Sequence, residues 1–138
     1  MSRLPVLVAA LWWVSLSTIG FLVVPMLFVH LPTPAMAGSM AAKLFSAQTW
    51  VSCVCGMLLL ICVKRSLVPV PAVRAAIVLI AIGVLMALLA EFVVAPRIVA
   101  RNNLRVWHSV GSAMYLLQWL CAAATFWKVM PPRQTDQV

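Results

Sequence analysis

The sequence predicts an all-α integral membrane protein, a four-transmembrane-helix bundle that forms a single domain over residues 1–138. Hydrophobic residues make up 65% of the chain and charged residues only 9%, whereas soluble domains average about half and about a quarter. The apolar residues fall into four runs, each with the roughly 20 residues needed to cross a bilayer core. The runs lack two-residue alternation, so helices are expected rather than barrel strands.

The first apolar run predicts a span over about residues 5–30. Pro5 suits the start of a helix, where its missing N–H leaves no bond unmade. Pro25 lies inside the run and is expected to kink the helix, freeing the carbonyl of Phe21. Arg3 and the sequence Ala35-Met36-Ala37 raise the alternative of a cleaved signal peptide. The apolar core is longer than the about 7–15 residues of a signal peptide, so an uncleaved span is expected.

The remaining spans are expected over about residues 43–63, 72–95 and 107–128. A proline-rich connector, residues 31–38, separates the first two spans, and Pro96 is expected to end the third. The stretch from Arg97 to Arg105 holds three arginines and two asparagines, which predicts a polar loop. Trp107 and Trp127 bracket the fourth span as interfacial anchors would. A polar tail follows over residues 131–138, and no internal repeat stands out.

Ten Lys/Arg residues outnumber two acidic ones, giving a net charge of +8. The basic residues lie singly or in small groups between apolar runs, which favours a lipid bilayer as partner and not nucleic acid. One side of the predicted bundle carries Arg3, Lys64, Arg65, Arg74, Lys128 and Arg133, and the other carries Lys43, Arg97, Arg101 and Arg105. The positive-inside rule therefore predicts a multi-pass protein of the bacterial inner membrane with both termini in the cytoplasm.

Because the spans alternate in direction, most of the polar residues are predicted to meet at one end of the bundle, on the periplasmic side. These residues are His30, Lys43, Gln48, Glu91, Arg97, Arg101, Arg105 and His108. Helical spacing also predicts which faces turn inward, since small and polar residues gather where membrane helices touch. The inward faces are Gln48, Ser52, Cys55 and Cys62 on the second span; Ala76, Gly83, Ala87 and Glu91 on the third; and His108, Ser112, Tyr115, Gln118, Ala122 and Thr125 on the fourth.

Among the polar residues, Glu91 is the one whose predicted place inside a membrane span most needs an explanation. It is expected about four residues, or roughly 6 Å, inside the end of its span. A carboxylate at that depth is unfavourable unless it is paired or protonated. One interpretation is a structural ion pair with Arg97, Arg101, Arg105 or Lys43. The other is a proton-linked or ligand-binding carboxylate.

His30 and His108 are the candidate metal or haem ligands, because both are expected at the same end of the bundle. The alternative is that each only caps a helix or bonds a loop carbonyl. The four cysteines fall inside apolar runs and behave as small hydrophobic residues. The sequence contains no nucleophile–base pair, phosphate loop or nucleotide motif. An enzyme is therefore not expected, and no cofactor is predicted, with haem b or copper as the alternative.

Several short motifs recur in the order and spacing of a known family. They are Gly20-Phe21 with Phe28 and Leu31-Pro32; Ala37-Gly38 with Lys43-Leu44-Phe45; Glu91 with Pro96-Arg97; and Arg105 followed by His108-Ser109. On these motifs the chain resembles the transmembrane-protein-205-like family, whose bacterial members form a domain of unknown function. The resemblance implies four spans and supplies no reaction. The layout is more remotely similar to the copper-resistance D group and to a haem-binding four-helix family, although no span centre here holds the histidine those relatives use.

Three functional hypotheses follow from the sequence. The first is a non-enzymatic membrane protein whose one-sided polar cluster binds a small ligand, ion or lipid, or docks a partner. The second is a haem- or metal-binding redox protein that uses His30 and His108, with Glu91 as a further candidate. The third is an accessory or scaffold subunit of a larger membrane complex. Small-residue helix faces also suit a homo-oligomer.

Overall fold

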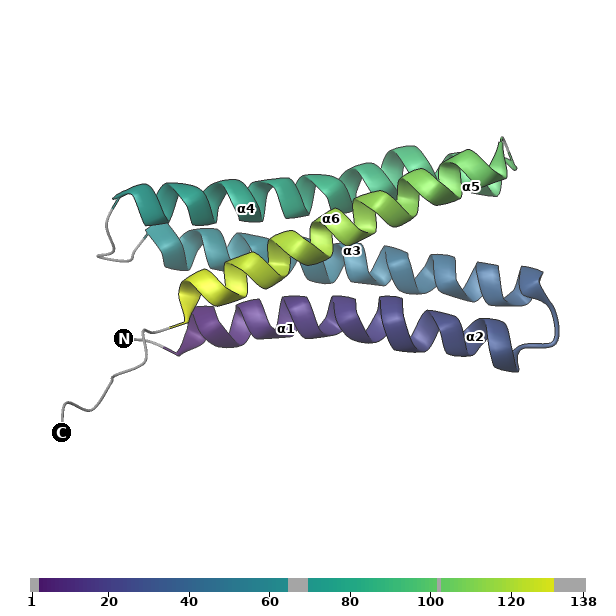
Figure 1. Cartoon of the computed structure of the whole chain (residues 1–138), viewed down its shortest axis with the longest axis horizontal. Coiled ribbons are helices and arrows are strands. Elements are labelled where there is room, and N and C mark those ends of the chain that lie inside the picture. The colour runs from purple at the N-terminus through teal and green to yellow at the C-terminus, as the bar shows by residue number, and fades with distance from the viewer. Residues whose placement is uncertain (1–2, 65–69, 102, 131–138) are drawn as a thin grey trace.

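The computed structural model describes residues 3–64, 70–101 and 103–130, and over these residues the chain is helical without strands. Four helices are long and apolar enough to cross a membrane: Leu4–His30, Pro34–Lys64, Val73–Val99 and Leu104–Val129. They run side by side in alternating directions (Figure 1). The predicted all-α fold with four candidate membrane-spanning helices is therefore confirmed. Arg65, Arg133 and the polar tail predicted over residues 131–138 lie outside the described residues.

The first span continues through Pro25 to His30 instead of ending there. It consists of helix α1 (Leu4–Thr18), a π-helical turn η1 (Ile19–Val23) and helix α2 (Val24–His30). Proline has no N–H to donate, and its ring displaces the carbonyl four residues before it, which here belongs to Phe21. The wider π turn, which lies directly before α2, accommodates this change in hydrogen bonding. Pro25 therefore shifts the register of the helix without interrupting it.

The second span begins earlier than predicted, because helix α3 covers Pro34–Lys64 and not about 43–63. The connector is correspondingly shorter than residues 31–38. The Oγ1 atom of Thr33 accepts a hydrogen bond of 3.3 Å from the N–H of Met36, as an N-cap residue does. Pro34 then occupies the first helical position, where a proline is favourable. Lys43 consequently lies nine residues, about 13 Å, inside the helix.

The third and fourth spans also extend beyond their predicted ends. The third comprises α4 (Val70–Leu89), a second π turn η2 (Ala90–Val94) and α5 (Ala95–Val99), so it continues through Pro96. Helix α6 covers Leu104–Val129. The expected polar loop from Arg97 to Arg105 is therefore wrong in extent, because Arg97 belongs to α5 and Arg105 to the first turn of α6. The connection is tight, and Arg101 and Asn103 adopt positive φ angles of 54° and 46°.

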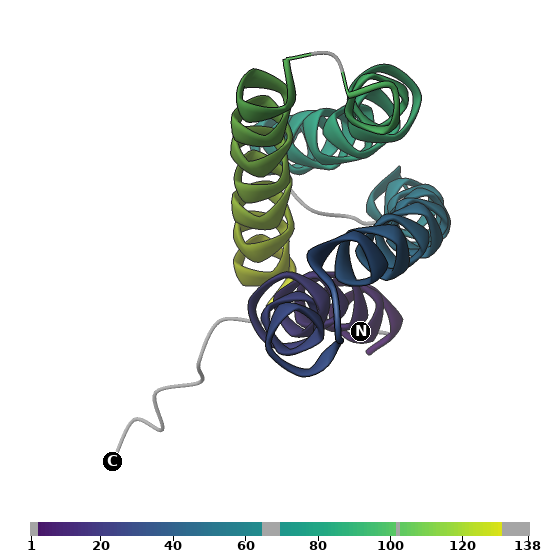
Figure 2. The same ribbon diagram turned by 90° about the vertical axis from the view of Figure 1, so that its right-hand side faces the viewer.

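The four spans share one apolar core. It includes Trp12 and Leu16 from α1, Leu59 from α3, Ile80 from α4 and Ala122 from α6. Helices α1 and α4 each pack against both α3 and α6, and Figure 2 shows the four spans around a common centre, with α6 running obliquely to the others. Two glycines permit close approaches in this core: Gly83 faces Trp12, and Gly56 faces Val84. Small residues at these positions let the helix axes come together, as is usual in membranes.

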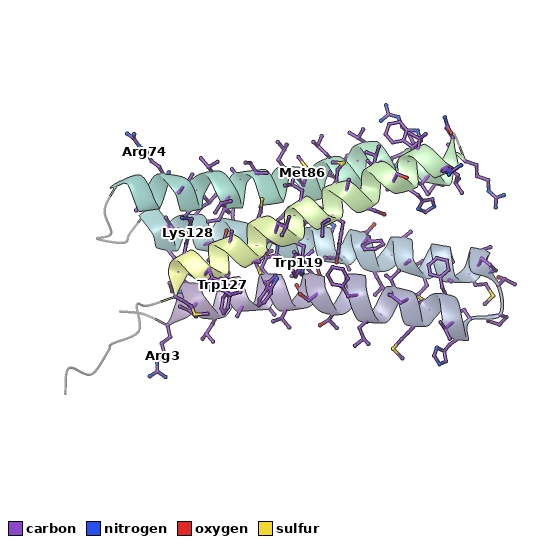
Figure 3. The ribbon with its side chains drawn as sticks, in the orientation of Figure 1. Arg3, Arg74, Met86, Trp119, Trp127 and Lys128 are labelled. Carbon is purple, nitrogen blue, oxygen red and sulfur yellow. The ribbon has the colours of Figure 1, made fainter. Side chains whose placement is uncertain are left out.

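An aromatic cluster lies between α1 and α6 in the half of the molecule that carries the termini. Trp13 lies 5.9 Å from Trp119, 5.6 Å from Phe126 and 5.9 Å from Trp127, measured between ring centroids. Arg3, Arg74 and Lys128 project from the same end in Figure 3. Tryptophan and basic residues concentrate where a helix leaves the bilayer. This arrangement matches the grouping of basic residues on which the predicted orientation depends.

The orientation can be tested by cysteine labelling in intact cells. In a chain whose four cysteines are replaced by alanine, we expect Ser39→Cys to react with a membrane-impermeant maleimide added outside, and Met130→Cys to react only after permeabilisation. Ser39 is exposed near the start of α3, Met130 is exposed after α6 at the opposite end, and neither change alters the charge balance. Labelling of Met130→Cys in sealed cells would reverse the predicted topology.

Candidate functional site

A cavity of about 560 Å³ lies between the four spans towards the end opposite the termini. All four spans contribute to its lining: η1 with α2, the first half of α3, the end of α4 with η2 and α5, and the first half of α6. At this end α6 diverges from α1 and α2 and runs towards α5 (Figure 1). Ligand pockets for small molecules commonly have volumes of about 300–1,000 Å³. The cavity therefore has the size of a small-molecule site.

The structure divides the predicted site residues into two groups. Glu91, Gln48 and His108 line the cavity. The other predicted members of the cluster, Lys43, Arg97, Arg105 and His30, are exposed and are not among its lining residues. The expected single cluster is therefore not formed, because the basic residues lie on exposed helix faces outside the cavity.

Glu91 lies in the π turn η2 and is half-buried. One of its carboxylate oxygens, Oε1, accepts a hydrogen bond of 2.7 Å from the hydroxyl group of Ser46 on α3. Because the span continues to Val99, Glu91 lies eight residues from its end, or about 12 Å. Glu91 is thus about twice as far from the end of its helix as the sequence predicted.

The expected ion pair of Glu91 is not formed within the described part of the chain. Arg97 instead donates a hydrogen bond of 3.2 Å to the carbonyl of Val93, and its guanidinium lies 4.4 Å from the ring centre of Trp107. Six residues separate Arg97 from Glu91, which places the two side chains on different sides of the helix. Arg97 therefore anchors the end of the third span to α6 and leaves the carboxylate to Ser46.

Two buried glutamine side chains connect three helices below the cavity. Gln118 on α6 donates from Nε2 to Ser52 Oγ at 2.8 Å, and Gln48 donates from Nε2 to Ser15 Oγ at 3.0 Å. Both serine hydroxyls donate their own hydrogens to backbone carbonyls, Ser52 to Gln48 and Ser15 to Trp12. They can therefore only accept from the glutamines, which fixes the orientation of both amides.

The amide oxygen of Gln48 has no hydrogen-bond partner among the described residues, although it is buried. The whole Gln48 side chain is only 2% exposed and lines the cavity. Nearly all buried polar atoms in proteins are paired, so each exception needs an explanation. This oxygen is covered by protein atoms, so it is an unpaired acceptor within the cavity wall and is not open to a molecule in the cavity.

Tyr115 forms the aromatic part of the cavity wall, together with Phe45. Its hydroxyl donates a hydrogen bond of 2.8 Å to the carbonyl of Leu16, just before the π turn η1. The ring lies against Gly20, where an added Cβ would come within 2.5 Å of Tyr115 Cε1. Phe45 meets Tyr115 edge to face, with 5.2 Å between ring centroids. Gly20 is therefore the residue that lets Tyr115 reach across to the first span.

The two halves of the chain contribute to the cavity in the same way. The π turn η2 begins 71 residues after η1, and α6 begins 70 residues after α3. In both halves a proline follows the π turn by two residues. The lining residues of the second helices correspond as Gly38 to His108, Ala41 to Gly111, Ala42 to Ser112, Phe45 to Tyr115 and Gln48 to Gln118. Two equivalent helical hairpins therefore enclose the cavity, although the sequence alone showed no repeat.

The two hairpins differ at one lining position, where one of them carries a charged residue. Glu91 occupies the place in η2 that Gly20 occupies in η1. On the Gly20 side, the space next to the backbone is filled by the ring of Tyr115. On the other side a carboxylate takes that place. The cavity is therefore polarised, with its negative group on the wall formed by the third span.

The two histidines do not form a common metal site. His30 lies on the exposed surface of α2, where Nδ1 is 3.0 Å from the carbonyl of Met26, whereas His108 lines the cavity. Within the described residues, no group of three or more His, Cys, Asp or Glu side chains is placed to hold a metal ion. The geometry thus lends no support to a site shared by His30 and His108.

Comparison with protein families gives one match, which covers residues 7–107 and is described as a domain of unknown function (DUF4149). The chain belongs to the DUF4149 family. The matched segment runs from α1 to the start of α6 and includes Gln48 and Glu91. No curated protein and no solved structure matches the chain. The resemblance to the transmembrane-protein-205-like family and to the copper-resistance D group stays a prediction.

Proposed function

We propose that this DUF4149 protein is a non-enzymatic protein of the bacterial inner membrane that binds a small, largely apolar molecule in the cavity between its spans. The observation that carries the proposal is the composition of the cavity wall. Most of its lining is apolar, yet it includes the Glu91 carboxylate and the polar side chains of Gln48 and Gln118. Apolar walls with a few placed polar groups are typical of small-molecule sites.

The margins of the cavity favour entry from the lipid phase. Phe21 and Phe28 on the first span and Leu116 on α6 line the cavity and are also exposed. Helix α1 packs against α6, whereas α2 packs against α3, so the first and fourth spans separate towards this end. A molecule dissolved in the bilayer would reach the cavity between them.

The hydrogen bonding of the lining supports binding rather than catalysis. The hydroxyl groups of the lining residues Thr49 and Tyr115 each donate to a backbone carbonyl. A hydroxyl that acts as a nucleophile instead needs a base that accepts its proton. The haem or metal alternative receives less support, because His30 lies outside the cavity.

The proposed orientation places both termini in the cytoplasm and the cavity towards the periplasmic side. Its support is the positive charge at the terminal end, where Arg3, Arg74 and Lys128 project (Figure 3). The alternatives of a homo-oligomer and of a subunit in a larger complex stay predictions. Neither conflicts with a cavity that lies within one chain.

Photolabelling with a diazirine-bearing octanol tests the proposed cavity. In lipid nanodiscs, we expect the label on peptides from η1, α3, η2 and α6. Gly38→Phe should reduce labelling about tenfold by filling the cavity, since a Cβ at Gly38 meets nothing within 4 Å. Ala47→Phe is the matched control, because Ala47 is exposed on α3 and is not a lining residue. Equal labelling of the two variants and the parent chain would contradict the proposal.

A further inference from the structure

The hydroxyl groups around the cavity already donate their hydrogens within the protein. Ser46 donates to Glu91, Thr49 to Phe45, and Tyr115 to Leu16. The amide nitrogens of Gln48 and Gln118 donate to Ser15 and Ser52. The remaining polar lining residues, His108 and Ser112, are exposed on α6. The hydroxyl hydrogens of Ser46, Thr49 and Tyr115 are therefore committed within the protein, while the Glu91 carboxylate can still accept from a bound molecule.

The charges of the lining residues also favour a ligand that donates hydrogen bonds. Among the described residues, Glu91 is the lining residue with a formal charge when His108 is neutral, and no Lys or Arg lines the cavity. This absence is notable in a chain with ten Lys/Arg residues. A carboxylate at this depth is unfavourable in lipid unless a cation or a proton compensates it. The cavity thus selects positive charge although the protein as a whole is basic.

The apolar part of the lining also suits a cation. Phe21, Phe28, Phe45 and Tyr115 contribute aromatic rings, and an aromatic face attracts an ammonium group through its quadrupole. Phe45 and Tyr115 are in edge-to-face contact and occupy corresponding positions in the two hairpins. A carboxylate beside aromatic rings in an apolar cavity is a combination that binds an ammonium group better than a neutral or anionic one.

We propose that the cavity binds a lipophilic ammonium, a molecule with an apolar body and one cationic, N–H-bearing head. The head pairs with the Glu91 carboxylate, which lines the cavity. The body contacts the aromatic lining and enters between α2 and α6. This proposal rests on the proposed function, because it names the class of ligand for the same cavity.

Competition for the photoreactive octanol tests the class of ligand. In nanodiscs at neutral pH, unlabelled octylammonium, octanol and octanoate are compared as competitors. We expect octylammonium to compete at about tenfold lower concentration than octanol, which corresponds to about 1.4 kcal/mol, and octanoate to compete least. In Glu91→Gln, a variant of the same shape, the ratio of octylammonium to octanol potency should fall about tenfold. Comparing ratios between the two chains cancels partitioning into the lipid.

The outcomes separate the class of ligand from the existence of the site. The ammonium assignment is overturned if the potency ratio is unchanged in Glu91→Gln, or if octanoate competes more strongly than octylammonium. The cavity itself is still supported in that case, provided that Gly38→Phe loses the label. Labelling that Gly38→Phe does not reduce overturns both proposals. Equal potency of octylammonium and octanol in the parent chain also overturns the assignment, since a proton alone then compensates Glu91.

Discussion

Replacing Trp12 with alanine is expected to lower the free energy of unfolding by about 3–5 kcal/mol, the range for truncating a buried aromatic side chain. Trp12 is fully buried in the shared core and packs against Gly83 of α4. In a bilayer the loss is mainly one of packing contacts, because lipid is as apolar as the core. Equilibrium unfolding in mixed micelles, followed by helical circular dichroism, would measure the change. Trp50→Ala is the control, since Trp50 is 63% exposed and its loss should change stability by less than about 0.5 kcal/mol.

The contact between Trp12 and Gly83 predicts that the effect of a change at Gly83 depends on the side chain at position 12. A Cβ at Gly83 would lie 2.8 Å from Trp12 Cη2, so Gly83→Ala should destabilise by about 1–3 kcal/mol through overpacking. In the Trp12→Ala background the same change should destabilise less, because the clashing ring is gone and only the contact with Cys121 Cβ at 3.3 Å remains. Gly38→Ala provides a glycine change without a neighbour and should not destabilise. Additive effects of the two core changes would show that the ring and the glycine do not interact.

The inward faces of the helices could be predicted from the sequence because they depend only on helical periodicity. The face that includes Gln48, Ser52 and Cys55 is buried on α3, and Gln118, Ala122 and Thr125 are buried on α6. Small and polar residues repeat there every three or four positions, while lipid-facing positions carry large apolar residues. Of the candidate site, Glu91, Gln48 and His108 were found in this way.

The helix ends could not be predicted from apolarity, and the error displaced the rest of the candidate site. Pro34 and Pro96 were interpreted as lying outside the spans, but Pro34 starts α3 and the third span continues from the π turn η2 through Pro96. Whether a proline ends a helix or widens it depends on packing by neighbouring helices, which a single span does not reveal. The Thr33-Pro34 pair was a usable start signal, since Thr caps and Pro follows at the first position.

The aromatic wall and the paired hairpins were also missed. Gly20 reads as one small residue in an apolar run, and only the position of Tyr115 shows that the ring needs that space. The correspondence of the halves rests on few shared residues, such as Gln48 with Gln118 and Pro25 with Pro96. The offset changes from 71 to 70 residues at the connectors, which conceals the repeat in an ungapped comparison.

Replacing Glu91 with leucine is expected to raise the stability of the protein while it abolishes the preference for an ammonium ligand. An acidic or basic residue inside a membrane helix is unfavourable by up to about 2.5–3.5 kcal/mol relative to an apolar one, the value at the helix centre. The hydrogen bond from Ser46 offsets about 1.5–3 kcal/mol at most. We therefore expect Glu91→Leu to stabilise by about 1 kcal/mol, as measured by unfolding in mixed micelles at neutral pH.

Glu91→Gln distinguishes the charge of the carboxylate from its hydrogen bond, because the amide oxygen can still accept from Ser46. If the charge is what makes Glu91 unfavourable, both variants should be at least as stable as the parent chain. A loss of more than about 1 kcal/mol in both would instead make the carboxylate a structural tie between η2 and α3. A ligand-binding group is expected to lower the stability of the protein while it polarises the cavity, since function and stability are often in opposition.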